Sequence, residues 1–220
     1  MITNLNNKMK PIEIINQNED QVKSRILDHI EKEFSNHGFR NFAVDQIANE
    51  LHISKKTIYK YFQTKEGLIR TVLIKQLTVA YREVVTIIQA QSNIVEKFVD
   101  LSNMVEEYFT VFNEESLKRL KCHFPHLAAY IELFRFNRIV PLISLLLKRG
   151  RKQNLILEIP DEIILKVFSS SLGAIVEARS EPTSKFSYHQ MFRHAFNMLL
   201  NGILTKKGKQ LLNYKLEVIK

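Results

Sequence analysis

Three observations predict an all-α fold of about nine or ten helices, with a small N-terminal domain followed by a larger one. Apolar residues recur every three or four positions through most of the 220 residues, which is the period of an amphipathic helix. No alternating pattern of comparable length indicates a strand. Two short helical patterns separated by only three residues lie near the N-terminus, and this arrangement is typical of a helix-turn-helix.

Charge and composition favour a cytoplasmic protein with an anionic partner. The formal net charge is +9 and the pI about 9.5, which favours a polyanion, although many basic proteins bind no nucleic acid. Four lysines and no acidic residue lie between His52 and Lys65. The single cysteine, Cys122, excludes an internal disulfide and fits a reducing compartment. No signal peptide or membrane-spanning pattern is present, so we expect no membrane contact.

The first 66 residues divide into an arm and three helices. Residues 1–19 are rich in asparagine and lack helical periodicity, so we expect a flexible arm. A helix over 20–37 is predicted by a stripe that consists of Val22, Ile26, Ile30 and Phe34. A shorter helix begins near Val44 with Asn41 as its cap, and a tight turn over 52–54 leads to a third helix over 55–62. Ser54 is a suitable N-cap for that third helix.

The third helix has two chemically different faces. Ile58 and Phe62 lie four positions apart and are expected to face inward. The opposite face then presents Lys56, Thr57 and Lys60, with Tyr59 and Tyr61 beside them. Such a helix can dock in a major groove, and composition alone leaves a solvated surface helix equally open. The short helix and three-residue turn that precede it favour DNA.

The remaining chain reads as helical almost throughout. Thr64 is expected to cap a long fourth helix, Ser92 a fifth, and Asn113 a short sixth over 114–121. A seventh helix over 125–152 contains Pro141, which is expected to kink it because proline removes a backbone donor. Further helices are predicted over 160–179, over 187–204 and, with fraying, after 205.

Residues 25–74 resemble the DNA-binding domain of TetR-type regulators. The resemblance lies in Ile53-Ser54-Lys55-Lys56-Thr57-Ile58-Tyr59-Lys60-Tyr61-Phe62 and in Thr64-Lys65-Glu66-Gly67-Leu68. The family pattern there is Val-Ser-Lys-Gly-Thr-Leu-Tyr-x-Tyr-Phe, followed by Lys-Glu-x-Leu. Asp45 departs from the basic or neutral residue that is usual in the family, so we expect it to stabilise the helix N-terminus. The resemblance implies DNA contacts from Lys55, Lys56, Thr57, Tyr59, Lys60, Tyr61 and Lys65, with Gln46 and Lys23 as weaker candidates.

The resemblance also implies how the chain divides and works. Residues 20–66 would form the helix-turn-helix domain, and residues 67–220 a ligand-binding and dimerisation domain. The protein would be a homodimeric repressor that a small, largely apolar or aromatic effector releases from a palindromic operator. A DNA-bound adaptor controlled by a protein partner is the alternative.

The resemblance assigns roles within the larger domain, where core packing is the alternative for any aromatic residue. The candidate effector-binding residues are Phe98, Tyr108, Phe109, Phe112, Phe134, Phe136 and Phe168. The last two long helices would pair with their copies in the dimer, through Ser170, Ala174, Ala178, Phe192, Phe196 and Leu199.

Enzymatic and metal chemistry find little support in the sequence. It contains no glycine-rich phosphate loop, no G-x-S-x-G motif and no coherent group of a nucleophile with a base. Cys122, His123 and His126 lie close together, but a fourth ligand is missing and Pro125 interrupts the helical spacing. We therefore expect no metal site, no cofactor and no catalytic residues.

Overall fold

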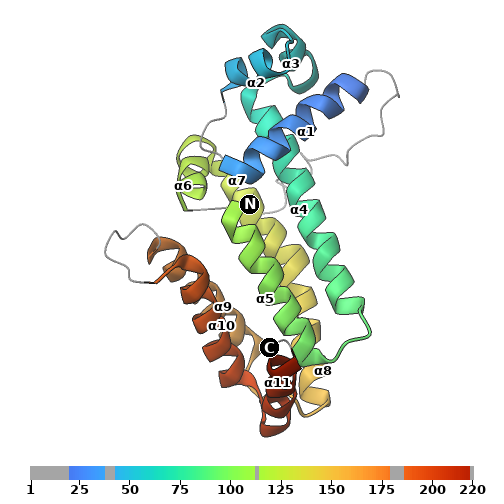
Figure 1. Cartoon of the computed structure of the whole chain (residues 1–220), viewed down its shortest axis with the longest axis vertical. Coiled ribbons are helices and arrows are strands. Elements are labelled where there is room, and N and C mark those ends of the chain that lie inside the picture. Colours follow the sequence, from blue (N-terminus) through green and yellow to red (C-terminus); the bar gives the residue numbers. More distant parts are fainter. Residues whose placement is uncertain (1–19, 38–42, 112–113, 179–185, 219–220) are drawn as a thin grey trace, which may run out of the picture.

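The computed structural model describes residues 20–37, 43–111, 114–178 and 186–218, which form an elongated helical molecule (Figure 1). Its only extended pairing among these residues is an isolated bridge between Ile156 and Leu204. The elements are α1 (Asp20–His37), α2 (Val44–Glu50), α3 (Lys55–Phe62), α4 (Lys65–Gln89), α5 (Ile94–Val111), α6 (Glu114–His123), α7 (Pro125–Phe134), η3 (Arg135–Ile139), α8 (Val140–Lys152), α9 (Asp161–Ala178), α10 (Tyr188–Ile203) and α11 (Lys206–Val218). With α7, η3 and α8 taken as one kinked helix, the described residues contain 10 helices, and the predicted all-α fold is confirmed.

Capping side chains set several of the helix boundaries. The Ser54 hydroxyl accepts a hydrogen bond of 3.0 Å from the Thr57 amide at the start of α3. Thr64 accepts one of 2.9 Å from the Gly67 amide at the start of α4. Both caps agree with the prediction, because each satisfies an amide that has no partner within its helix.

Two other predicted caps are wrong, and a third lies outside the described residues. The N-cap of α2 is Ala43, which makes no side-chain bond, while Asn41 is not described. The cap of α5 is Asn93 rather than Ser92. Its side-chain oxygen accepts from the amides of Val95 and Glu96 at 2.9 and 3.0 Å, and the Glu96 carboxylate accepts from the Asn93 amide at 2.9 Å. This reciprocal pair satisfies more donors than Ser92 alone would. Asn113 likewise lies outside the described residues.

The long helix over 125–152 is interrupted where Pro141 predicts a kink. The interruption is the π-helical stretch η3, and Pro141 lies in the first turn of α8 directly after it. Proline has no amide hydrogen and its ring clashes with the carbonyl four residues earlier, so a widened turn relieves the contact.

Two buried clusters divide the molecule, and α4 contributes to both. The N-terminal cluster joins α1 to α4 with the corner between α6 and α7, and its most buried members are Ile26, Ile30, Ile58, Leu68, Val72, Leu73, Leu120 and Leu127. The second cluster joins the end of α4 to α5, α8, α10 and α11 through residues that include Val84, Val95, Leu146, Leu147, Leu200 and Leu212. The predicted domain boundary after residue 66 falls inside the first cluster. Helix α4 therefore connects the helix-turn-helix to the larger half of the protein (Figure 1).

Candidate DNA-binding interface

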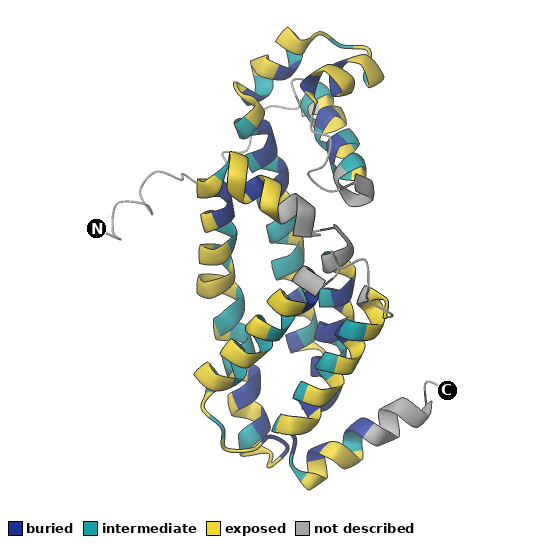
Figure 2. Cartoon of the chain, turned by 90° about the vertical axis from the view of Figure 1, so that its left-hand side faces the viewer, coloured by how far each residue is buried: buried dark blue, intermediate teal, exposed yellow. Residues whose placement is uncertain are grey.

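Helix α3 carries its two faces as the sequence predicts. The side chains of Ile58 and Phe62 are buried in the N-terminal cluster, with exposed fractions of 0% and 5%. Lys55, Lys56, Tyr59 and Lys60 are exposed. Because α3 lies at the outer end of the molecule, this exposed face is turned toward solvent (Figures 1 and 2). The polar face is thus accessible to a large ligand such as a duplex.

Two of the candidate contact residues on α3 are partly engaged in the protein itself. The hydroxyl groups of Thr57 and Ser54 are 2.8 Å apart and share a hydrogen bond. The Tyr61 ring packs against the N-terminal cluster, and the Lys60 ammonium lies 5.5 Å from its centroid. Lys55, Lys56, Tyr59 and Lys60 therefore form the outward surface, which we call the reading face.

The candidates outside α3 differ in how accessible they are. Lys65 is exposed at the first position of α4, next to the reading face in sequence. Gln46 donates a hydrogen bond of 2.8 Å to Glu50, which also lies 2.6 Å from His29 Nε2. The hydrogen bond from Gln46 lowers the pKa of the Glu50 carboxyl most, and the hydrogen bond with His29 lowers it further. Lys23 on α1 is partly buried. Gln46 and Lys23 are thus less available to DNA than Lys65.

Asp45 makes an ion pair that the sequence does not reveal. It lies in the first turn of α2, and its carboxylate pairs with the ammonium group of Lys55 at the first position of α3. Both side chains are exposed, by 64% and 56%. One lysine of the reading face is therefore held by a carboxylate of the neighbouring helix.

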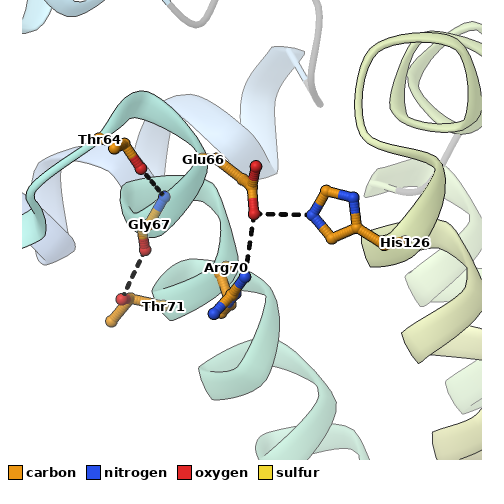
Figure 3. Close-up of polar contacts among 6 residues, drawn as sticks. All are labelled: Thr64, Glu66, Gly67, Arg70, Thr71 and His126. Atoms are coloured by element: carbon orange, nitrogen blue, oxygen red, sulfur yellow. Dashed lines mark hydrogen bonds and ion pairs between the residues drawn. The ribbon is translucent and has the colours of Figure 1, made fainter. Parts of the chain in front are cut away.

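A polar contact attaches α7 to the start of α4, only a few residues after the reading face (Figure 3). The Glu66 carboxylate accepts hydrogen bonds from His126 Nε2 at 2.7 Å and from Arg70 Nη2 at 2.9 Å. His126 is 60 residues away in sequence. Leu127, beside it on α7, is buried in the N-terminal cluster. The corner between α6 and α7 is thereby fixed to the helix-turn-helix.

This contact predicts a pH dependence of stability. The hydrogen bond from His126 lowers the pKa of the Glu66 carboxyl below its ordinary value of 4.5, burial opposes the shift, and Arg70 adds to it. A lowered folded-state pKa means that Glu66 stabilises the fold above pH 4.5 and loses this contribution as the pH falls through the lower value. We expect Glu66→Gln to reduce the thermal midpoint at neutral pH and to have a shrinking effect in acid. Melting curves of both proteins over this range measure it.

The matched control removes the other partner. In a His126→Ala background, Glu66→Gln should change the midpoint less, because the largest cause of the pKa shift is gone. An undiminished effect in that background would show that His126 does not stabilise the Glu66 carboxylate.

The candidate effector residues do not all lie in similar surroundings. Phe98 is buried in the second cluster, with 8% of its surface exposed. Phe136 is 69% exposed on η3 and faces solvent, so it cannot line an enclosed site in the protomer. Phe112 and the side chain of Phe109 lie outside the described residues. Only Tyr108, Phe134 and Phe168 are partly buried.

The three partly buried candidates contact other aromatic or acidic residues. Burial and the nearby Glu83 carboxylate, which accepts a hydrogen bond from the phenol, raise the pKa of Tyr108 to about 12. The Phe134 ring meets Tyr81 edge-on, with centroids 6.3 Å apart, and the Phe168 ring meets Phe196 in the same way at 5.9 Å. Each of the three side chains therefore has an aromatic or acidic neighbour within the larger domain.

The candidate dimer residues divide into exposed and buried ones. Ser170 and Ala174 are exposed on α9, on the same face as Ile163 and Val167, which are 52% and 46% exposed. Leu199 and Phe196 are partly buried, and the side chain of Ala178 is not described. Phe192 has no exposed surface, because its ring packs against α9 and α5 of its own protomer. The interpretation of Phe192 as a dimer contact is therefore wrong.

The cysteine and the two histidines near residue 124 do not converge on a common point. Cys122 is an exposed free thiol, His123 Nδ1 lies 3.0 Å from the Arg119 carbonyl oxygen, and His126 contacts Glu66. Among the described residues, no group of three or more potential ligands could hold a metal ion. The same part of the chain contains no helix both long and apolar enough to cross a membrane.

Residues 26–72 match the model of a family described as bacterial regulatory proteins, tetR family. The fold is similar to that of a transcriptional regulator from Saccharomonospora viridis solved with choline, with a TM-score of 0.71, 16% identity, and coverage of 85% of this chain and 100% of that one. A transcriptional regulator from Cytophaga hutchinsonii gives a TM-score of 0.67 at 19% identity, with coverage of 84% and 99%. A fatty acid degradation regulator from Bacillus halodurans gives 0.61 at 18%, with coverage of 86% and 97%. A comparison with curated proteins found no match.

The fold, the exposed helix-turn-helix and the matching N-terminal domain define a DNA-binding transcriptional regulator. The family match covers residues 26–72, which contain the helix-turn-helix and the first part of α4. The matched family and the similar structures are regulators rather than enzymes.

Proposed function

We propose that this protein is a homodimeric repressor that binds a near-palindromic operator and leaves it when a small organic effector binds the larger domain. The observation that carries the DNA-binding part is the reading face: Lys55, Lys56, Tyr59 and Lys60 are exposed on a helix whose other face is anchored by Ile58 and Phe62. Lysines and tyrosine hydroxyls there can reach phosphates and base edges. Further DNA contacts are proposed for residues beside the reading face, namely Thr57, Tyr61 and Lys65.

Two-fold symmetry follows from the proposed interface on α9 and α10. These helices lie side by side (Figure 1), and they expose Ile163, Val167 and Met198, the last by 75%. Exposed apolar side chains on adjacent helices are typical of a surface that another subunit covers. A symmetric dimer would present two copies of α3 to successive major grooves, which favours a palindromic site.

The effector proposal rests on Tyr108, Phe134 and Phe168 in the larger domain. Their partly buried rings favour an apolar or aromatic molecule, and the Glu83 carboxylate beside Tyr108 supplies one polar partner. One similar structure is a regulator in complex with choline, and another is a regulator of fatty acid degradation. An effector that binds one orientation of α4 better than another would shift the reading faces, because α4 spans both buried clusters.

Selection of bound sequences from random duplex DNA tests the proposed function. We expect the protein to enrich a palindrome and the variant Lys56→Ala/Tyr59→Ala/Lys60→Ala to enrich none. Each lost base contact costs about 1–3 kcal/mol of discrimination between sequences. Each lost phosphate contact reduces the salt slope, which is the steepness with which log affinity falls with log salt concentration, by about 0.9.

The control is Lys148→Ala/Lys152→Ala, which also removes two positive charges, but from exposed positions of α8. It should enrich the same palindrome as the unmodified protein. Weak binding that ignores sequence in all three proteins would refute the proposed function and indicate simple electrostatic attraction.

A further inference from the structure

The ion pair between Asp45 and Lys55 joins the two helices of the helix-turn-helix at the edge of the reading face. From this geometry we infer that Asp45 determines specificity: it acts through Lys55, whose ammonium group it orients for the operator, and it lowers affinity for other DNA. The inference rests on the proposed function, because it assigns a role within the same DNA-binding surface. Asp45 is a positioning residue, since Lys55 would make the contact.

The local arrangement leaves Asp45 and Lys55 as a separate pair. The other carboxylate of α2, Glu50, is already engaged by Gln46 and His29. Thr57 is bonded to Ser54, and the Lys60 ammonium lies over the Tyr61 ring. Asp45 thus pairs across the turn with the lysine at the first position of α3, where side chains can reach the duplex.

Orientation matters for lysine because its side chain is long and flexible. A lysine side chain that is free in solution loses rotamer entropy when it is fixed in one conformation. A carboxylate that already holds the ammonium near its bound position reduces this cost, and the remaining ammonium protons stay available for a base edge or phosphate. The effect requires the defined geometry of the operator complex, so it favours the operator alone.

The same carboxylate opposes binding to DNA in general. Affinity for duplexes of arbitrary sequence comes almost entirely from phosphate neutralisation. A lysine compensated by Asp45 contributes less to that term, and the carboxylate itself repels phosphates. One residue therefore favours the operator and disfavours other sequences, which is how a repulsive element improves specificity.

The test compares Asp45→Asn with the unmodified protein on the selected operator and on a random duplex of equal length. We expect operator affinity to fall by about two- to fivefold, the range for an exposed ion pair. On random DNA we expect affinity to rise and the salt slope to steepen by about 0.9, as for one additional phosphate contact. Simple electrostatics predicts the opposite sign on the operator, because the substitution removes a negative charge.

Two further variants show whether Asp45 acts through Lys55. In a Lys55→Ala background, Asp45→Asn should no longer lower operator affinity. In the otherwise unmodified protein, Asp45→Glu should retain most of the operator affinity, because the negative charge remains. Thermal melts establish that each variant is folded. Tighter or unchanged operator binding by Asp45→Asn, or an equal loss without Lys55, would overturn the inference. If selection enriches no site at all, the proposed function itself fails, which is a separate outcome.

Discussion

Replacement of Phe192 with alanine should lower the free energy of unfolding by about 3–5 kcal/mol, as expected for a fully buried phenylalanine. The ring has no exposed surface and packs with Ile175 and Val105, and it stacks on Phe196 with centroids 6.2 Å apart. Truncation would leave a cavity between α9, α10 and α5 that these helices can fill only by moving. Urea unfolding followed by circular dichroism, at one fixed protein concentration, measures the loss.

A second phenylalanine supplies the matched control. Phe136→Ala removes the same atoms from a ring that is 69% exposed on η3, so we expect a change of less than about 0.5 kcal/mol. If Phe192→Ala were as mild as Phe136→Ala, Phe192 would not belong to the core of the protomer.

Charge placed on the α9 and α10 surface should dissociate the proposed dimer. We expect Val167→Asp/Met198→Asp to be monomeric at micromolar concentrations, because burial of unpaired carboxylates at an apolar interface costs several kcal/mol. Operator affinity should then fall by about 10²- to 10⁴-fold, since the second reading face no longer binds at a high effective concentration. Sedimentation and operator titration measure the two effects separately.

The control for the dimer variant places the same charges elsewhere. Val79→Asp/Leu145→Asp changes exposed apolar residues of α4 and α8 and should leave the proposed dimer intact. Dissociation of this control with an intact Val167→Asp/Met198→Asp dimer would move the interface to the other face of the molecule.

The elements of the helix-turn-helix could be predicted from the sequence alone, because short-range interactions govern them. Ser54 and Thr64 cap their helices through bonds to amides three residues away, and Ile58 and Phe62 share a helix face because they are four residues apart. The same local logic located the kink at Pro141. It failed at Ser92, where the choice between two adjacent capping residues depended on the reciprocal bond from Glu96 to Asn93.

Which apolar and charged groups face each other depends on how the helices pack, and it could not be predicted from the sequence. Periodicity assigns Phe192 to a helical stripe, but it cannot tell whether that stripe meets the protein's own core or a second subunit. The structure buries Phe192 in the core and exposes Met198 on the same helix. Contacts such as Glu66 with His126 join residues 60 positions apart. The partners in such contacts are set by how whole helices pack, so spacing along the chain carries no signal for them.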